Sequence, residues 1–202
     1  MEISNQGFGA YDIRGIYPTE VNETLAYRVG RAFVALLGAK RVAVGHDIRL
    51  SGPAISEALT RGLTEAGCDV VDIGQCGTEM IYFATAHWQL DGGIMVTASH
   101  NPKNYNGMKL VREGARPISR DTGLLDIEKA VMAGDFPPPA EPSGKVEKRD
   151  VTDDYVAHLL SYIDVKSLKP LTVVANTGNG AGGPIVEALA KRGFNILEAD
   201  AT

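Results

Sequence analysis

The sequence has few cysteines, no long apolar run and no basic tract, and each absence excludes a class of protein. Cys68 and Cys76 are the only two cysteines in 202 residues, which excludes a disulfide scaffold and favours a reducing compartment. No uninterrupted apolar stretch approaches the roughly 20 residues that span a bilayer. The opening stretch, MEISNQGFGAYDIRG, lacks the basic segment and apolar core of a signal peptide. A cytoplasmic protein without a membrane partner is therefore expected.

The charge balance excludes another class of partner. Acidic residues outnumber basic ones, 25 to 20, and give a formal net charge of -5. A net acidic chain without a basic tract is a poor candidate for binding nucleic acid. An anionic small substrate stays possible, because a few lysines and arginines focused in a cleft are enough to bind it.

Hydrophobic periodicity predicts an α/β domain in the first part of the chain. Apolar residues at helical spacing predict helices over 22–37 and from about 51 to 66, and further helices are expected over 79–87 and 124–133. Short strands are predicted at RVAVGHD, CDVVDIG and GGIMVTA. Strands that alternate with helices through short loops favour parallel βαβ units.

One turn signal interrupts the parallel pattern. Asn106-Gly107 is typical of a tight turn, so MKLV is predicted to fold back against IMVT as an antiparallel hairpin. We therefore expect a mixed, mostly parallel sheet with helices on both faces.

A domain boundary is predicted near residue 148. Residues 134–150 contain four prolines and a charged tail, which is typical of a connector. It divides a first domain, 1–148, from a second, 149–202. The second starts with an amphipathic helix around Tyr155 to Ile163 and continues as strand, glycine loop, helix and strand. A single strand-helix-strand unit rarely buries enough surface to be stable alone, so an incomplete second α/β domain is expected.

The glycine loop gives one hypothesis about function. Residues 178–183, GNGAGG, match the G-x-G-x-x-G fingerprint of dinucleotide-binding folds and lie between a predicted strand and a predicted helix. Pro184 follows at once, so the helix is expected to begin after the glycines rather than to pack through the last of them. A tight strand-to-helix turn explains the glycines equally well. A dinucleotide-binding module remains the alternative reading.

The stretch IMVTASHNPKNYNGMKL, residues 94–110, gives a different hypothesis. Its apolar start leads into a polar loop built around Ser99. The lipase-type elbow G-x-S-x-G is not met, because Thr97 and Asn101 occupy the glycine positions, and no signature links a histidine to Ser99. A hydrolase is therefore disfavoured.

A phosphoryl carrier fits the same stretch better. A phosphoserine carries close to two negative charges and needs donors around it. His100, Asn101, Lys103 and Lys109 follow Ser99, and the expected hairpin would return Lys109 beside it. Phosphoryl transfer depends mainly on positioning and on neutralising spread charge, which such side chains can do.

These residues resemble a known family. TASHNPKNYNGMKL is similar to the phosphoserine loop of the α-D-phosphohexomutases, the family of phosphomannomutase and phosphoglucomutase. AYDIRG, GHDIRLSG, GTEMIYFA, DGGIMVTASHNP, NGMKLVREGARPIS and NTGNGAGGP resemble family segments in the same order. The similarity covers nearly the whole chain. Two stretches, GTEMIYFATAHWQLDGGI and NGMKLVREGARPIS, look like those of bacterial phosphomannomutases that supply mannose 1-phosphate for GDP-mannose.

The resemblance implies roles for three residues of the serine segment. Ser99 matches the serine that carries the phosphoryl group and exchanges it with substrate. His100 matches a histidine that contacts the phosphoryl group or the substrate. Lys109 matches a lysine that acts as general acid/base or stabilises the transferring phosphoryl group.

Further residues are implied to lie near the reacting centre. Tyr11 and Arg14 match an N-terminal pair, in which the arginine can clamp phosphate. Asp47 and Arg49 match a loop close to the cleft, and Asn101 is expected among the phosphate-binding groups.

The resemblance also implies a reaction, a metal and further domains. The family interconverts hexose 6-phosphate and hexose 1-phosphate through a bound hexose 1,6-bisphosphate. It requires Mg²⁺, which the phosphoryl oxygen on Ser99 would bind together with carboxylates of an aspartate-rich loop. This chain has no such loop, no sugar-choosing loop and no C-terminal phosphate loop. C-terminal domains of the same protein are therefore expected, and the chain alone is expected to be inactive or to act as a non-catalytic partner domain.

Overall fold

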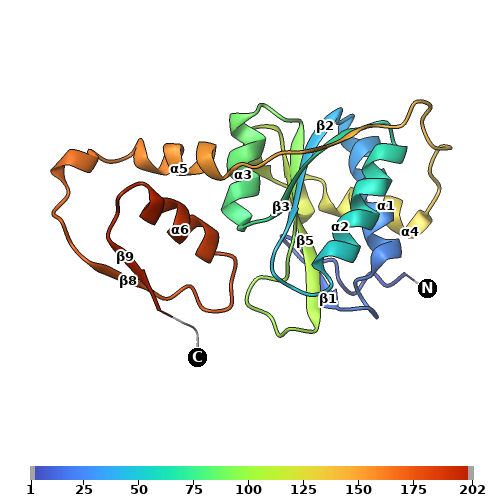
Figure 1. Ribbon diagram of the computed structural model, residues 1–202. Coiled ribbons are helices and arrows are strands. Elements are labelled where there is room, and N and C mark those ends of the chain that lie inside the picture. Colours follow the sequence, from blue (N-terminus) through green and yellow to red (C-terminus); the bar gives the residue numbers. More distant parts are fainter. Residues whose placement is uncertain (1–2, 200–202) are drawn as a thin grey trace.

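The computed structural model describes residues 3–199, and its largest feature is a seven-stranded sheet (Figure 1). The strands are β1 (Ile13–Ile16), β2 (Arg41–His46), β3 (Asp69–Gln75), β4 (Gly92–Val96), β5 (Tyr105–Arg112), β6 (Arg116–Pro117) and β7 (Val146–Lys148). Their order is β1-β5-β4-β2-β3-β7, with β6 beside β5. The four strands β4, β2, β3 and β7 run parallel, whereas β5 is antiparallel to β1, β4 and β6. The mixed sheet predicted from the sequence is confirmed.

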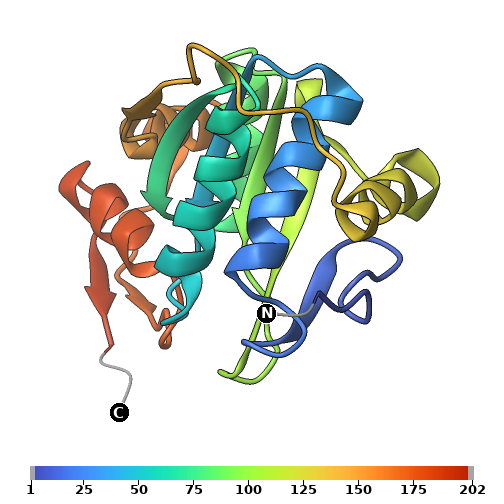
Figure 2. The ribbon, with the colours of Figure 1, turned by 90° about the vertical axis from the view of Figure 1, so that its right-hand side faces the viewer.

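Helices cover both faces of this sheet, as predicted. Figures 1 and 2 show helices on both faces. The first face is covered by α1 (Glu23–Leu37), α2 (Gly52–Glu65) and α4 (Leu124–Ala133), and α3 (Thr78–His87) lies on the other. Two apolar cores result. Val42 and Val44 of β2 belong to the core under the three helices, whereas Ala43 between them belongs to the core under α3, which is the period of two that a strand requires.

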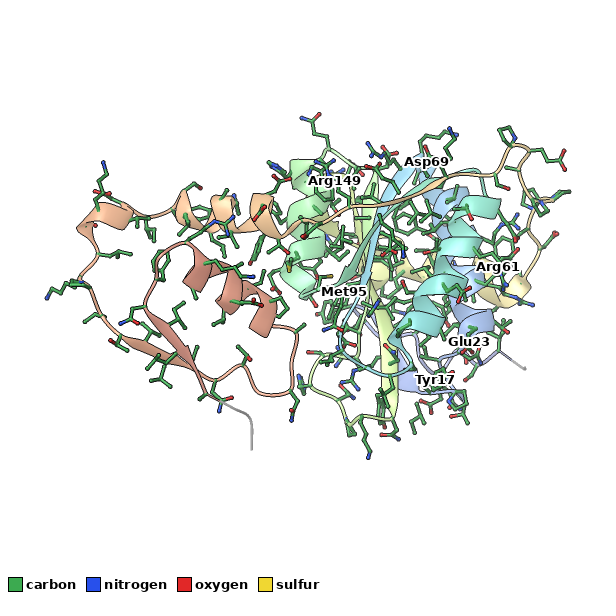
Figure 3. All side chains as sticks on the ribbon, viewed as in Figure 1. Tyr17, Glu23, Arg61, Asp69, Met95 and Arg149 are labelled. Atoms are coloured by element: carbon green, nitrogen blue, oxygen red, sulfur yellow. The ribbon has the colours of Figure 1, made fainter. Side chains whose placement is uncertain are left out.

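The first helix shows how local sequence sets its ends. Asn22 caps α1 by accepting the N–H of Leu25 at 2.9 Å, and Gly38 ends the helix in the left-handed conformation. Near its start, Glu23 accepts a hydrogen bond from the hydroxyl of Tyr17, and both residues are labelled in Figure 3. The helix predicted over 22–37 is confirmed.

The turn predicted at Asn106-Gly107 is wrong, although the antiparallel pairing is confirmed. Both residues lie inside β5, and the connection from β4 is the longer polar stretch 97–104. The buried side chain of Asn106 donates to Ser51 Oγ at 2.8 Å. Gly107 faces Arg14 on β1, and a Cβ added there would lie 2.0 Å from the carbonyl oxygen of Ile13. The dipeptide therefore provides close approach between strands rather than a change of direction.

The proline-rich stretch 134–150 also contains regular structure. Its last part is β7, which pairs with β3 at the edge of the sheet. The chain then leaves the sheet past Arg149, whose guanidinium lies 3.9 Å from the centre of the Trp88 ring. The helix α5 (Thr152–Leu160) follows and contacts α3, partly through Tyr155 and Phe83.

The last described residues form a small unit of their own. It consists of β8 (Val173–Ala175), α6 (Gly183–Lys191) and β9 (Ile196–Glu198), with the two strands parallel, in agreement with the predicted strand, glycine loop, helix and strand. Val174 is 67% exposed and Leu197 is 55% exposed. The two-stranded sheet thus leaves apolar surface uncovered. None of the helices within residues 3–199 is both long enough and apolar enough to cross a membrane.

Candidate active site

The predicted site residues gather at one end of the sheet. The parallel strands β2 and β4 end side by side, with His46 opposite Val96. The loops that follow them carry Asp47 and Arg49 on one side and Ser99 on the other. Carboxyl ends of parallel strands are the usual position of binding sites in α/β proteins, because the loops there converge on one crevice.

These loops border a cavity of about 610 Å³. Ser99, Asn101 and Lys103 line it from the loop after β4. Asn179 and Gly180, from the glycine loop before α6, line it from the second unit. The glycine loop and the serine loop, which supported competing hypotheses, therefore face the same space.

Ser99 has an unusual backbone conformation within its loop. Its φ is +56°, in the left-handed region that non-glycine residues seldom occupy. Its N–H donates to Thr97 Oγ1 at 2.8 Å, and the Thr97 hydroxyl donates in turn to Asp47 Oδ2 at 2.6 Å. Such a conformation costs about 1–3 kcal/mol and persists only where surrounding contacts determine it. The serine side chain is left exposed at the cavity.

Arg49 supplies most of those surrounding contacts. Its side chain is only 10% exposed, and its Nε donates to Asp47 Oδ2 at 3.2 Å. Each terminal nitrogen donates to two backbone carbonyl oxygens, which belong to Ser99, Asn101, Pro102 and Tyr105. A guanidinium has five N–H donors, so every donor of Arg49 is engaged. Arg49 and Asp47 lie at the cleft as the resemblance implies, and here they hold the serine loop in shape.

Arg14 and Lys109 meet at a residue that the sequence analysis did not select. Asp12 Oδ2 accepts from Arg14 Nη2 at 2.5 Å and from Lys109 Nζ at 2.8 Å. Arg14 also donates from Nη1 to Asn101 Oδ1 at 2.7 Å, which connects this group to the serine loop. Burial raises the pKa of the Asp12 carboxyl, but the hydrogen bonds and positive charges of Lys109 and Arg14 outweigh burial, so the net pKa lies below its ordinary value of 3.8.

The route by which Lys109 reaches the site differs from the one expected. The hairpin was predicted to turn at residues 106 and 107 and so to return Lys109 beside Ser99. Because the connection is longer, Lys109 pairs with Met95, which lies deeper in β4. Its ammonium reaches the group around Asp12 instead.

His100 and Tyr11 are the least constrained of the predicted residues. His100 Nδ1 lies 3.4 Å from Ser99 Oγ, and its side chain is exposed. Tyr11 is 79% exposed and does not line the cavity next to Ser99. Both can therefore contact a molecule that enters from solvent.

Cys76 also lines the cavity, but its chemistry differs from that of Ser99. It is buried and contacts Met95 sulfur at 3.8 Å. Burial, together with the nearby charges of Glu79, Asp47 and Asp72, raises the pKa of its thiol to about 12. A thiol that stays protonated is a poor nucleophile, so Cys76 forms part of the apolar floor.

A Mg²⁺ site of the kind expected needs carboxylate ligands besides the phosphoryl oxygen on Ser99. Across residues 3–199, no group of three or more His, Cys, Asp or Glu side chains is placed to hold a metal ion. Asp12 and Asp47, which are connected to the serine loop by hydrogen bonds, are both engaged with cations. The described side chains do not by themselves fit a complete magnesium site.

Two residues of this site were missed by sequence reasoning. Asp12 stands inside AYDIRG, two residues before Arg14, so its position next to a selected residue was a usable signal. Thr97 was considered only as a departure from the hydrolase elbow. Its role as a hydrogen-bonding link between Asp47 and Ser99 depends on two strands that lie adjacent only in the fold.

Comparison with known proteins shows the family to which the chain belongs. Residues 5–137, more than half of the chain, match the family model for phosphoglucomutase/phosphomannomutase, alpha/beta/alpha domain I. Phosphomannomutase from Escherichia coli is 55% identical over 193 residues, which are 95% of this chain and 42% of that protein. A protein named phosphohexose mutases from Xanthomonas campestris is 55% identical over 91% of this chain and 41% of its own length. The chain thus spans less than half the length of these relatives.

Solved structures give the same result. A phosphoglucomutase/phosphomannomutase family protein from Burkholderia thailandensis superimposes with a TM-score of 0.86 at 38% identity, over 98% of this chain and 44% of that one. A putative phosphomannomutase from Thermus thermophilus superimposes with a TM-score of 0.77 at 30% identity, over 95% of this chain and 44% of that one. The chain belongs to the phosphoglucomutase/phosphomannomutase family, and it carries the family's domain I.

Proposed function

We propose that this chain supplies the phosphoserine-bearing part of a phosphohexomutase, which interconverts hexose 6-phosphate and hexose 1-phosphate. The main supporting observation is that Ser99 is exposed at the cavity. Hydrogen bonds with Thr97 and Arg49 hold the backbone of its loop. Family membership supports the same reaction. Phosphorylated Ser99 would be the phosphoryl donor at the start of each cycle.

The proposed cycle has two phosphoryl transfers. In the first, a hydroxyl oxygen of the bound hexose phosphate attacks the phosphorus on Ser99 and the bond from phosphorus to Ser99 Oγ breaks. The proton of the sugar hydroxyl passes to Ser99 Oγ. The product is a bound hexose 1,6-bisphosphate. After this intermediate reorients in the site, Ser99 Oγ attacks the phosphorus of its other phosphate, and the bond from that phosphorus to the sugar oxygen breaks. The proton of Ser99 passes to that sugar oxygen, so that Ser99 is phosphorylated again and the hexose monophosphate product is formed.

The residues around Ser99 would act by position and charge. Asn101 and Lys103 line the cavity beside the transferring group, and His100 can contact it from the solvent side. Arg14 and Lys109 supply positive charge nearby, which suits a transition state that spreads negative charge over phosphoryl oxygens. Tyr11 would contact the substrate from its exposed position.

Mannose is the proposed sugar, and the cytoplasm the proposed location. The relatives from Escherichia coli and Salmonella typhimurium that are named phosphomannomutase are 55% identical to this chain, which supports mannose as the sugar. Mannose 1-phosphate made in this way would supply GDP-mannose synthesis. Two unpaired cysteines agree with a reducing compartment.

Mg²⁺ and hexose 1,6-bisphosphate are the proposed cofactor and activator. The phosphoryl oxygen on Ser99 would be the metal ligand from this chain, and carboxylates from C-terminal domains of the same protein would complete the site. Because the chain spans 42% of the E. coli relative, we also infer that the 202 residues alone do not complete the cycle.

The dinucleotide alternative has less support. The glycine loop 178–183 lies at the start of α6 as a fingerprint would, but it faces the cavity of the serine loop. The match to domain I of the mutase family lies elsewhere in the chain, at residues 5–137. Titration with NAD(H) tests this alternative, and saturable tight binding would restore it.

A labelling experiment tests the proposed function. The intact parent protein, which is this chain together with the proposed C-terminal domains, is incubated with a hexose 1,6-bisphosphate and Mg²⁺. The added phosphoryl group is then located by peptide mass spectrometry. We expect the label on Ser99 and its loss in Ser99→Ala. An unmodified Ser99 in the active protein would contradict the proposal. Mutase assays of the chain, with and without a separately made C-terminal half, test the expected inactivity.

A further inference from the structure

We propose that Asp12 is a positioning residue, whose carboxylate holds Lys109 and Arg14 together beside the serine loop. This inference rests on the proposed phosphoryl transfer and deepens it. It assigns a role to a residue that neither the motif nor the chemistry of Ser99 identifies.

The first observation is that one oxygen serves two cations. Asp12 Oδ2 accepts from Lys109 Nζ at 2.8 Å and from Arg14 Nη2 at 2.5 Å. The pairing of β1 with β5, with Ile13 opposite Met108, brings these three side chains together although 97 residues separate Asp12 from Lys109. All three are only partly exposed, so solvent screens their charges incompletely.

The second observation is that the group is connected to the serine loop. Arg14 donates from its other terminal nitrogen to Asn101 Oδ1, two residues after Ser99. Its Nε is buried and has no hydrogen-bond partner among the described residues. The guanidinium is therefore oriented by Asp12 at one end and by the loop at the other, and its orientation depends on both.

The charges explain why a carboxylate is needed. Lys109 and Arg14 both contact the same oxygen of Asp12, so their positive charges would repel each other. The carboxylate of Asp12 compensates one of these two charges. The group keeps a net positive charge, which favours a phosphoryl group on the adjacent loop. With Asp12 in place, that charge is held in one position before the substrate arrives, and such preorganisation is what phosphoryl transfer requires.

Asp12→Asn is the decisive variant, because it keeps the size of the side chain and removes its charge. In the intact parent protein we expect kcat to fall about 100-fold, the effect typical of a displacement of roughly 1 Å in a reacting group, with KM changed less than about twofold. Asp12→Glu should recover part of the loss. The control is Asp126→Asn, which removes an exposed carboxylate paired with Lys129 on α4 and should leave kcat unchanged.

A double-mutant cycle separates positioning from a merely structural role. If Asp12 acts through Lys109 and Arg14, D12N should slow K109Q by much less than it slows wild type, because only the contribution through Arg14 is left to lose. Losses that multiply in the double variant would overturn the proposal. If D12N does not fold, the same cycle is carried out with D12E, and multiplied losses have the same meaning.

A measurement that does not depend on enzymatic activity tests this inference independently of the proposed function. In the 202-residue chain, a Lys109 ammonium held by Asp12 should give a resolved ¹⁵N–¹H signal, because its protons exchange slowly with water. The signal should vanish in D12N and persist in D126N. A signal unchanged in D12N would overturn the inference. Failure of wild-type protein to label Ser99 would instead contradict the proposed function.

Discussion

The guanidinium of Arg49 holds the backbone of Ser99, because Nη2 of Arg49 donates to the carbonyl oxygen of Ser99 at 2.8 Å. The same side chain reaches three further carbonyls of the loop, and Asp47 orients it. A charged group that is buried and fully hydrogen-bonded is well suited to impose a strained backbone on a neighbouring residue. This hydrogen bond joins the loop after β2 to the loop after β4. The conformation of Ser99 therefore depends on these two strands lying side by side in the sheet.

Replacing Arg49 should therefore loosen the serine loop. We expect Arg49→Met to lower the free energy of unfolding by about 2–3 kcal/mol, since hydrogen bonds from a charged donor are lost and carbonyls are left without partners. Urea unfolding of the chain measures this change. Amide exchange at Ser99 and Asn101 should become faster, while exchange in α1 stays as in wild type.

Lys129→Ala is the matched control for a lost cation. Lys129 forms an exposed pair with Asp126, which should contribute little to stability. An Arg49→Met variant as stable as Lys129→Ala, with unchanged amide exchange, would contradict the role assigned to Arg49.

Gly107 should not tolerate a side chain. A Cβ at this position would lie 2.0 Å from the carbonyl oxygen of Ile13, so β1 and β5 would have to separate. We expect Gly107→Ala to destabilise the chain by about 3 kcal/mol or more, in the range of severe overpacking. Thermal and urea unfolding measure the loss.

Gly180→Ala is the comparison for Gly107. Its nearest neighbour would be the carbonyl oxygen of Thr177 at 3.4 Å, so the added methyl group meets only ordinary contact. It should change stability by less than about 1 kcal/mol. Equal effects at the two glycines would mean that the close approach of β1 and β5 does not depend on Gly107.

The pairing of Asp12 should make stability depend on pH in a defined direction. The folded pKa of this carboxyl lies below 3.8, and its unfolded pKa is close to that value. The unfolded chain thus binds the proton more readily, so the pairing stabilises the fold above pH 3.8 and is lost as pH falls through the folded pKa. Unfolding of wild type and Asp12→Asn between pH 7 and pH 2.5 should show a stability difference that shrinks at the acid end. A constant difference would contradict the pairing.

Neither cysteine should react in the folded chain. Burial, aided by nearby acidic groups, raises the pKa of both thiols, Cys68 and Cys76, to about 12. Iodoacetamide at pH 8 should therefore label neither within the time that labels both in urea, and mass spectrometry counts the adducts. Fast labelling of Cys76 in the native chain would show that the cavity floor opens to solvent.

The sequence by itself determined most of the secondary structure and selected the candidate serine. Apolar spacing predicted α1 and α2, because this signal acts within a few residues. The alternation of strands and helices predicted a sheet covered on both faces for the same reason. TASHNP identified Ser99, since that motif lies in one continuous stretch.

Only the tertiary structure decided how that serine is held and which side chains surround it. Asn106-Gly107 looked like a turn and proved to be strand, because its conformation depends on β1 and Ser51 rather than on its own preference. Asp12 and Thr97 became site residues through partners that are 97 and 50 residues away. Contacts of this kind are made when strands pair, and residue type and spacing do not encode them locally. The strand that leads to Ser99 could therefore be predicted from the sequence, whereas the group of charges beside the serine loop could not.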